Sequence, residues 1–130
     1  MKKSKIRKHK FFKFTVEGDS LNPQEIKTAV NLPSKIFIKG QEETKYKILQ
    51  KTNRWLFCNN LCDEKDGSEF LTENLKIVEQ HLTELQPYLE KFDSYIELVV
   101  YAENETDLTL SKEQIALLNK IGAEFLISFC

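Results

Sequence analysis

The chain has 130 residues, of which 41 % are apolar and 30 % are charged, and its formal net charge is −1. This composition is typical of a water-soluble globular protein, and the length suffices for one domain with its own hydrophobic core. The longest uninterrupted apolar run covers residues 98–102, which is far too short to span a membrane. We therefore expect no membrane association and a single folded domain over residues 11–130.

The first ten residues form a basic segment with six Lys or Arg and no acidic residue. Such a segment is usually a solvated tail or the ragged start of an edge strand. It is as basic as the start of a signal peptide, but Lys13 and Glu17 interrupt the apolar stretch that should follow. We therefore expect a cytoplasmic protein with three reduced thiols, on Cys58, Cys62 and Cys130.

Charge is distributed unevenly along the chain. Residues 1–59 hold 14 Lys or Arg and 5 Asp or Glu, whereas residues 60–130 hold 5 and 15. The first part therefore carries +9 and the second −10, which sum to −1. In a folded domain part of this charge should pair, and the rest should survive as a basic patch and an acidic patch. A basic patch would attract polyanions, and an acidic patch would attract basic proteins.

The first part of the chain predicts a strand, a helix and three further strands. Residues 10–17 alternate between apolar and polar side chains, as in a half-buried strand. Asn22 is placed to cap a helix over residues 23–31, whose first position is Pro23. Shorter alternating runs predict strands over residues 35–39, 45–50 and 54–58, with a polar turn over residues 40–44.

The second part begins with a polar loop over residues 59–68 and continues with the clearest helical pattern of the chain. Leucine and valine recur over residues 71–85 at steps of three and four, which gives one apolar stripe. Pro87 should then start a short extra turn that runs to residue 92. An alternating run predicts a strand over residues 95–102.

The last two elements are a helix and a strand. Ser111 is placed to cap a helix that ends at Gly122, with Ile115, Leu118 and Ile121 pointing inward. Residues 124–130 carry apolar side chains at both alternating sets of positions. This pattern is typical of a strand in the interior of a sheet, where both faces are covered.

Two segments of the chain are similar to each other. L-N-P-Q-E-I at residues 21–26 and L-S-K-E-Q-I at residues 110–115 both place a Glu or Gln three positions after a capping residue. Each follows a predicted strand and starts a helix that leads into another strand. We therefore predict a two-layer α+β fold: a mixed, largely antiparallel sheet with the helices on one face, built from two similar strand–helix–strand halves.

No motif for catalysis, metal binding or cofactor binding is evident. Cys58 and Cys62 are four residues apart without a second pair, which suits neither a zinc site nor a redox pair. His81 lies on the flank of the long predicted helix and has no accompanying nucleophile motif. The sequence therefore predicts no catalytic residue, no metal ligand and no cofactor.

The strongest candidate for a binding surface is the sheet face that the helices leave uncovered. It should show Phe11, Lys13, Tyr95, Val99 and Tyr101. Aromatic side chains interleaved with lysine can stack on bases and contact phosphates. Covering loops or a homodimer interface would explain the same residues. We therefore name Phe11, Lys13, Tyr95 and Tyr101 as a candidate binding face without assigning its ligand.

The assembled pattern resembles a family of small bacterial proteins that share a domain of unknown function. The resemblance rests first on F-x-V-x-G-D-x-L-x-P-x-E-I at residues 14–26, which is its most specific part. It continues with L-P-S at residues 32–34, K-G at 39–40, the lone Trp55, the helix with Leu75 and Leu82, and residues 115–122. It implies a compact cytoplasmic bacterial domain without an assigned activity, in which Gly18 serves a backbone bend and Trp55 anchors the core.

Three functions remain open from the sequence. The first is a non-enzymatic protein-interaction module, for example an inhibitor or immunity-type protein that covers a basic partner with its acidic C-terminal part. The second is nucleic-acid binding through the basic N-terminal part, which the 15 acidic residues of the other part disfavour. The third is an enzyme or small-molecule binder whose pocket the sequence does not reveal. The lack of chemical motifs favours the first.

Overall fold

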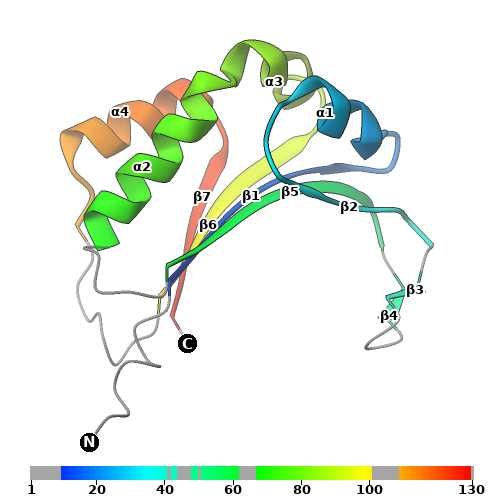
Figure 1. Cartoon of the computed structure of the whole chain (residues 1–130), viewed down its shortest axis with the longest axis horizontal. Coiled ribbons are helices and arrows are strands. Elements are labelled where there is room, and N and C mark those ends of the chain that lie inside the picture. The colour runs from blue at the N-terminus through cyan, green and yellow to red at the C-terminus, as the bar shows by residue number, and fades with distance from the viewer. Residues whose placement is uncertain are drawn as a thin grey trace, which may run out of the picture.

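A computed structural model describes residues 10–40, 42–43, 48–49, 51–61, 67–100 and 109–129 (Figure 1). This part of the chain forms four helices and seven strands. In chain order they are β1 (Lys10–Gly18), α1 (Pro23–Ala29), β2 (Lys35–Phe37), β3 (Glu42–Glu43), β4 (Ile48–Leu49), β5 (Asn53–Leu61), α2 (Gly67–Gln80), α3 (Leu82–Leu89), β6 (Asp93–Val100), α4 (Lys112–Ile121) and β7 (Glu124–Phe129).

Five strands form one curved sheet in the order β2-β5-β1-β6-β7. All neighbours are antiparallel except β6 and β7, which run parallel. Figure 1 shows α1, α2, α3 and α4 on the same side of this sheet. The predicted two-layer α+β fold, with a mixed and largely antiparallel sheet, is therefore confirmed.

The two similar segments both form capped helices on the same face of the sheet. Helix α1 joins β1 to β2, and these strands run parallel because both are antiparallel to β5, which lies between them. Helix α4 joins β6 to β7, which are parallel and adjacent. The two halves thus share a strand–helix–strand order. In the first half β5 lies between β1 and β2, whereas in the second half β6 and β7 are adjacent.

The caps that the sequence predicts are in place. The side chain of Asn22 accepts a hydrogen bond from the backbone N–H of Gln24 at 3.2 Å, and Pro23 occupies the first helical turn. Ser111 and Gln114 form a reciprocal capping box at the start of α4. Gly122 ends α4 with a φ of 80°, a left-handed conformation that glycine adopts without a steric penalty.

The core lies between the sheet and the helices, with β1 at its centre. The inward side chains of β1 are fully buried, and Trp55 on β5 is also 0 % exposed. The indole ring of Trp55 contacts Phe14 edge to face, with ring centroids 5.8 Å apart. The remaining buried apolar side chains come from all four helices, from β6, from Phe57 on β5, and from Leu21 and Val30 on either side of α1. Trp55 is therefore a core anchor, as the sequence predicts.

The long predicted helix is interrupted, which corrects the expected boundaries. Helix α2 ends at Gln80 and α3 begins at Leu82, with His81 between them at a non-helical φ of −111° and ψ of 15°. Pro87 lies inside α3 and does not start a separate turn. The change of direction lets one apolar stripe follow the curved sheet from α2 to the buried Leu85 (Figure 1). A three- to four-residue spacing does not reveal such a break.

Strand β5 is longer than predicted because it pairs along the whole of β1. Its register continues through Phe11 opposite Asn60, so residues 59–61 are strand and the loop expected over residues 59–68 is wrong there. The side-chain amide of Asn59 also donates to Asn74 of α2 at 2.6 Å. Strand β2 is shorter than expected, and β3 occupies part of the expected turn over residues 40–44. Most of the strand predicted over residues 45–50 lies outside the described residues, apart from β4.

Helix α4 is rotated relative to the prediction. Ile115 was expected inside but is 54 % exposed, whereas Gln114 is 0 % exposed and Leu117 and Ile121 are buried. The Gln114 side chain turns inward because its amide nitrogen lies 3.0 Å from acceptors on Ser68 and Thr72 of α2. A hydrogen-bonding side chain, which an apolar pattern ignores, therefore sets the phase of this helix.

Strand β7 lies at the edge of the sheet, which contradicts its predicted interior position. It pairs only with β6 among the described strands. Its apolar residues on both faces are consequently accessible, with Leu126, Ile127 and Phe129 at 45 %, 37 % and 51 % exposure. The pattern that indicates two covered faces is present, but one flank of the strand has no neighbour among the described strands.

Candidate functional site

The surface of interest is the sheet face opposite the helices, here called the open face (Figure 1). Side chains alternate between the two faces of each strand, and the strand registers align those that share a face. The open face accordingly consists of Lys35 and Phe37 on β2, Arg54, Leu56, Cys58 and Asn60 on β5, Phe11, Lys13, Thr15 and Glu17 on β1, Asp93, Tyr95, Glu97 and Val99 on β6, and Glu124, Leu126 and Ser128 on β7.

The open face carries two groups of apolar and small side chains, separated along the strands by the row of Cys58, Lys13 and Glu97. Thr15 lies directly opposite Leu56 on one side and Tyr95 on the other, and Phe11 lies opposite Val99. Thr15 is only 5 % exposed although the described helices all lie on the other side of the sheet. Its larger neighbours therefore shield it. The result is a row of aromatic, aliphatic and small side chains across three strands, which is the kind of surface that a macromolecular partner can cover.

Charge changes sign across the open face. Lys35, Arg54 and Lys13 lie on β2, β5 and β1. Three carboxylates lie towards the other edge, on Asp93, Glu97 and Glu124 of β6 and β7, and the fourth, Glu17, lies on β1 opposite Arg54. Strands β2, β5 and β1 come from the basic part of the sequence, and β6 and β7 from the acidic part. The charge separation of the sequence thus becomes a basic side and an acidic side of one surface.

Several polar groups on this face already have partners. The guanidinium of Arg54 lies 4.6 Å from the centre of the Phe37 ring, in cation–π geometry. The hydroxyl of Ser128 donates to the carboxylate of Glu97 at 2.6 Å. Lys13 lies directly opposite Glu97 in the register of β1 and β6. Several side chains of the open face therefore already interact with one another.

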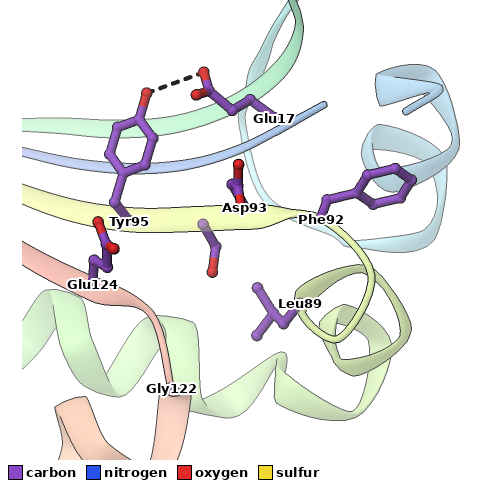
Figure 2. A pocket seen from close by; sticks show the side chains of 8 residues that line it. Glu17, Leu89, Phe92, Asp93, Tyr95, Gly122 and Glu124 are labelled. Carbon is purple, nitrogen blue, oxygen red and sulfur yellow. Dashed lines mark hydrogen bonds between the residues drawn. The ribbon is translucent and has the colours of Figure 1, made fainter. Parts of the chain in front are cut away.

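A hollow of about 420 Å³ lies at the acidic end of the face, where β1 ends and β6 and β7 begin (Figure 2). Its polar wall carries the carboxylates of Glu17, Asp93 and Glu124 and the phenol of Tyr95. The rest of the wall comes from Ser94, Gly122 and the apolar end of α3, at Leu89 and Phe92. None of these lining residues is basic, so the hollow favours a cationic group over an anionic one.

Tyr95 and Glu17 are coupled in this wall. The phenol of Tyr95 donates a hydrogen bond to Oε1 of Glu17 at 3.2 Å (Figure 2). The hydroxyl of Thr52 donates to the same oxygen at 3.4 Å. Burial raises the pKa of the Tyr95 phenol above its usual 10.0, and the negative charge of Glu17 raises it further. The phenol therefore stays protonated at neutral pH and acts as a hydrogen-bond donor.

Phe92 holds the neighbouring turn in place through a close approach to Gly18. A Cβ atom built on Gly18 would lie 2.7 Å from Cδ1 of Phe92, which is closer than carbon atoms approach in proteins. Only glycine leaves room for this ring. The φ of Gly18 is not among the positive values found at Gly40 and Gly122. The chain does bend here, because the backbone N–H of Leu21 donates to the carbonyl oxygen of Gly18 at 3.2 Å, and what requires glycine at this bend is the close approach of Phe92.

The structure places three of the four candidate binding residues, Phe11, Lys13 and Tyr95, together on the open face. Tyr101 lies outside the described residues. The carboxylates of Asp93 and Glu124 were not predicted, because they are distant in the sequence and meet Glu17 only through strand order. The alternation of residues 93–99 could have put Asp93 on the face of Tyr95, but no local signal brings Glu124 beside them.

Of the residues considered for metal or redox chemistry, the structure describes Cys58 and His81. Cys58 is exposed, and Cys62 and Cys130 lie outside the described residues. Nδ1 of His81 lies 2.9 Å from the carbonyl oxygen of Ile77. Within the described part of the chain, no three His, Cys, Asp or Glu side chains are arranged to hold a metal ion.

Within the described ranges, no helix is long and apolar enough to cross a membrane.

Comparison with known proteins identifies a family to which no function is assigned. No curated protein and no solved structure matches the chain. The family model of a domain of unknown function, DUF4279, matches residues 7–129, nearly the whole chain. The resemblance to a domain of unknown function is thereby confirmed, and this chain belongs to the DUF4279 family.

Proposed function

We propose that this protein is a non-enzymatic protein-interaction module that contacts its partner through the open face. The observation that carries the proposal is the surface itself: a sheet face without a covering helix among the described elements, on which apolar side chains lie next to charged ones. Protein–protein interfaces combine buried apolar side chains with polar and charged ones in this way. Leu56, Tyr95 and Val99, all half-buried in the free chain, would lose their remaining exposure in such a complex.

The partner that fits this surface is basic and partly apolar. The carboxylates of Asp93, Glu97 and Glu124 lie on the β6–β7 side and would attract cationic groups. The hollow beside Tyr95 would receive one long cationic side chain. This chemistry suits an inhibitor or immunity-type protein that covers a basic enzyme. We place this role in the bacterial cytoplasm, an expectation that rests on the family resemblance.

Site-specific photo-crosslinking in host cells tests this proposal. A photoreactive amino acid replaces Leu56 or Val99 on the open face, and matched control chains carry it at Lys27 on α1 or Glu84 on α3, both exposed. We expect one polypeptide, the same from both open-face positions, to be crosslinked there and not from the helices. Equal crosslinking from the helices, or none from the open face, would refute the proposal.

Charge reversal then tests the acidic side with the purified partner. Glu97→Lys should weaken binding by about tenfold or more at physiological salt, because it places a positive charge in the acidic group. Glu84→Lys on the exposed surface of α3 adds the same charge elsewhere and should leave the affinity within about twofold. Equal weakening by the two variants would show that only net charge matters.

Nucleic-acid binding is the alternative that the same surface must be tested against. Phe11 and Lys13 share the open face, as stacking and phosphate contacts require. The four carboxylates on the same face oppose a polyanion. We expect single-stranded DNA or RNA to bind no more tightly than about 100 μM at physiological salt. Sub-micromolar, salt-sensitive binding that is lost in Lys13→Gln would replace the proposed function with this one.

A further inference from the structure

The free edge of β7 lacks the protection that edge strands usually have. On one side β7 pairs with β6, and no described strand or helix pairs with its other side (Figure 1). Natural edge strands avoid association through lysine, proline, bulges or short length. The sequence of β7, E-F-L-I-S-F, contains no lysine, proline or glycine, and its one charge is on its first residue, Glu124. Its last five positions are open to pairing with another strand.

The most exposed large apolar side chains gather at this edge. Leu126, Ile127 and Phe129 lie on β7, and Ile115 lies on α4, which leads into β7. Phe125, Ile127 and Phe129 share the helix side of the strand, because Phe125 lies opposite the buried Ile96. An apolar row beside unpaired backbone groups would be costly to leave in water.

The sequence of β7 is complementary to itself in one antiparallel register. Residues opposite each other in an antiparallel pair must point to the same face. A twofold axis at Ile127 satisfies this condition: Ile127 meets its own copy, Phe125 meets Phe129, and Leu126 meets Ser128. An axis at Leu126 would instead leave Phe129 opposite Ala123, outside the strand, and would draw Glu124 into the paired region opposite Ser128.

From this complementarity we propose that two copies of the chain pair antiparallel through β7, with Ile127 on the twofold axis. The two five-stranded sheets then form one continuous sheet of ten strands. The apolar side chains on the helix side of both β7 strands form one row, in which each strand shields the flank of the other from water. A net charge of −1 per chain does not oppose the association. This inference concerns a different surface from the open face and does not depend on the proposed function.

The mass of the protein in solution tests the association directly. Light scattering coupled to size-exclusion chromatography should give twice the chain mass of 15.2 kDa for the wild-type protein at about 100 μM. Ile127→Lys places two like charges on the twofold axis and should give a monomer. Ala29→Lys adds the same charge on exposed α1, at the far side of the sheet, and should stay dimeric. A monomeric wild-type protein, or a dimeric Ile127→Lys, would overturn the proposal.

Disulfide crosslinking tests the register without relying on a destabilising charge. In a background with serine at the three natural cysteines, Ile127→Cys places two thiols opposite each other, with Cα atoms about 5 Å apart. Mild oxidation should crosslink most of the protein. Phe125→Cys in the same background lies opposite Phe129 and should crosslink at least about tenfold more slowly. Crosslinking of Phe125→Cys at an equal rate, or none for Ile127→Cys, would refute this register.

Discussion

Gln114 provides a sharp test of how the helical layer is held together. Its side chain is 0 % exposed. Its amide nitrogen lies 3.0 Å from the carbonyl oxygen of Ser68 and from the hydroxyls of Ser68 and Thr72. Its amide oxygen accepts from the backbone N–H of Ser111 at 2.8 Å. One side chain thus completes the cap of α4 and joins α4 to the first turn of α2.

The substitution Gln114→Glu separates these roles because it keeps the shape of the side chain. The carboxylate can still accept from Ser111, and the hydroxyls of Ser68 and Thr72 can rotate to donate to it. The carbonyl of Ser68 only accepts, so it keeps the helical N–H of Thr72, loses the Gln114 donor and faces a buried negative charge. That loss costs about 1–3 kcal/mol, and more for a charged group. The new negative charge lies at the N-terminus of α4, where its interaction with the helix dipole restores only about 0.5 kcal/mol. We therefore expect the free energy of unfolding to fall by about 3 kcal/mol at pH 7.

Acid should reverse most of this loss. A protonated Glu at position 114 has an O–H that can donate to the Ser68 carbonyl, so folding raises the pKa of this carboxyl above its usual value of about 4.3. Stability is then fully present below the unfolded pKa and is lost as pH rises through the raised folded pKa. The difference from the wild-type protein should shrink from about 3 kcal/mol at pH 7 to below about 1 kcal/mol near pH 4.

Urea unfolding, followed by the fluorescence of the single tryptophan, Trp55, measures the loss of stability at pH 7 and near pH 4. Gln80→Glu is the matched control, because Gln80 is exposed at the end of α2. It should cost less than about 0.5 kcal/mol at pH 7, and its loss should shrink far less in acid. A loss below about 0.5 kcal/mol for Gln114→Glu, or a loss that is independent of pH, would show that its amide nitrogen is not a buried donor.

Three further perturbations test the core and the hollow. Trp55→Ala should lower the free energy of unfolding by about 3–5 kcal/mol, because the ring is 0 % exposed; a loss under about 1 kcal/mol in urea unfolding would place the ring outside the core. Gly18→Ala should cost about 1–3 kcal/mol through its contact with Phe92, and the cost should fall when Phe92→Leu is present; additive losses in this double-mutant cycle would contradict that contact. The phenol of Tyr95 should ionise above its usual pKa of 10.0, so the stability it contributes is complete below pH 10.0 and declines as pH rises through its raised folded pKa. In a pH titration of tyrosinate absorbance, the step at the highest pH should be absent from Tyr95→Phe and should move to lower pH in Glu17→Gln. An unchanged step in either variant would contradict the coupling of Tyr95 to Glu17.

Local chemistry was sufficient for much of the fold. Asn22, Ser111 and Gly122 were assigned as helix caps because each satisfies backbone groups within a few residues of itself. The strand over residues 10–17 was predictable because alternation has a period of two whatever the neighbouring strands are. The same alternation placed Phe11 and Lys13 on one face, and that prediction needed no knowledge of strand order.

The features that sequence reasoning missed depend on contacts between distant segments. The inward turn of Gln114 requires acceptors on Ser68 and Thr72, more than 40 residues away. The break at His81 follows the curvature of a sheet that the helix itself does not encode. The hollow needs Glu17, Asp93 and Glu124 side by side, which only the strand order provides.

The wrong prediction of an interior position for β7 has a physical reason. Apolar side chains on both faces normally indicate a strand whose two faces are covered, as in the interior of a parallel sheet. Among the described strands β7 instead lies at the edge, and its large apolar side chains are exposed. Pairing with β7 of a second copy would place the strand in the interior of a longer sheet and shield its flank, while Leu126 on the open face would stay exposed.

Pairing through β7 would also change the open face. A twofold axis perpendicular to the sheet keeps both open faces on the same side, with the two acidic halves next to each other at the centre. The two Glu97 side chains would then lie three strand spacings or about 14 Å apart, and the two Glu124 side chains about 20 Å apart, between the basic strands of the two copies. Two acidic groups on one shared surface should strengthen both the attraction of a basic partner and its dependence on salt. Partner binding to Ile127→Lys should therefore be weaker and less sensitive to salt than binding to the wild-type protein. Ala29→Lys, which adds the same charge away from the edge, should keep the wild-type salt dependence, and equal salt dependence of all three proteins would show that the two surfaces act separately.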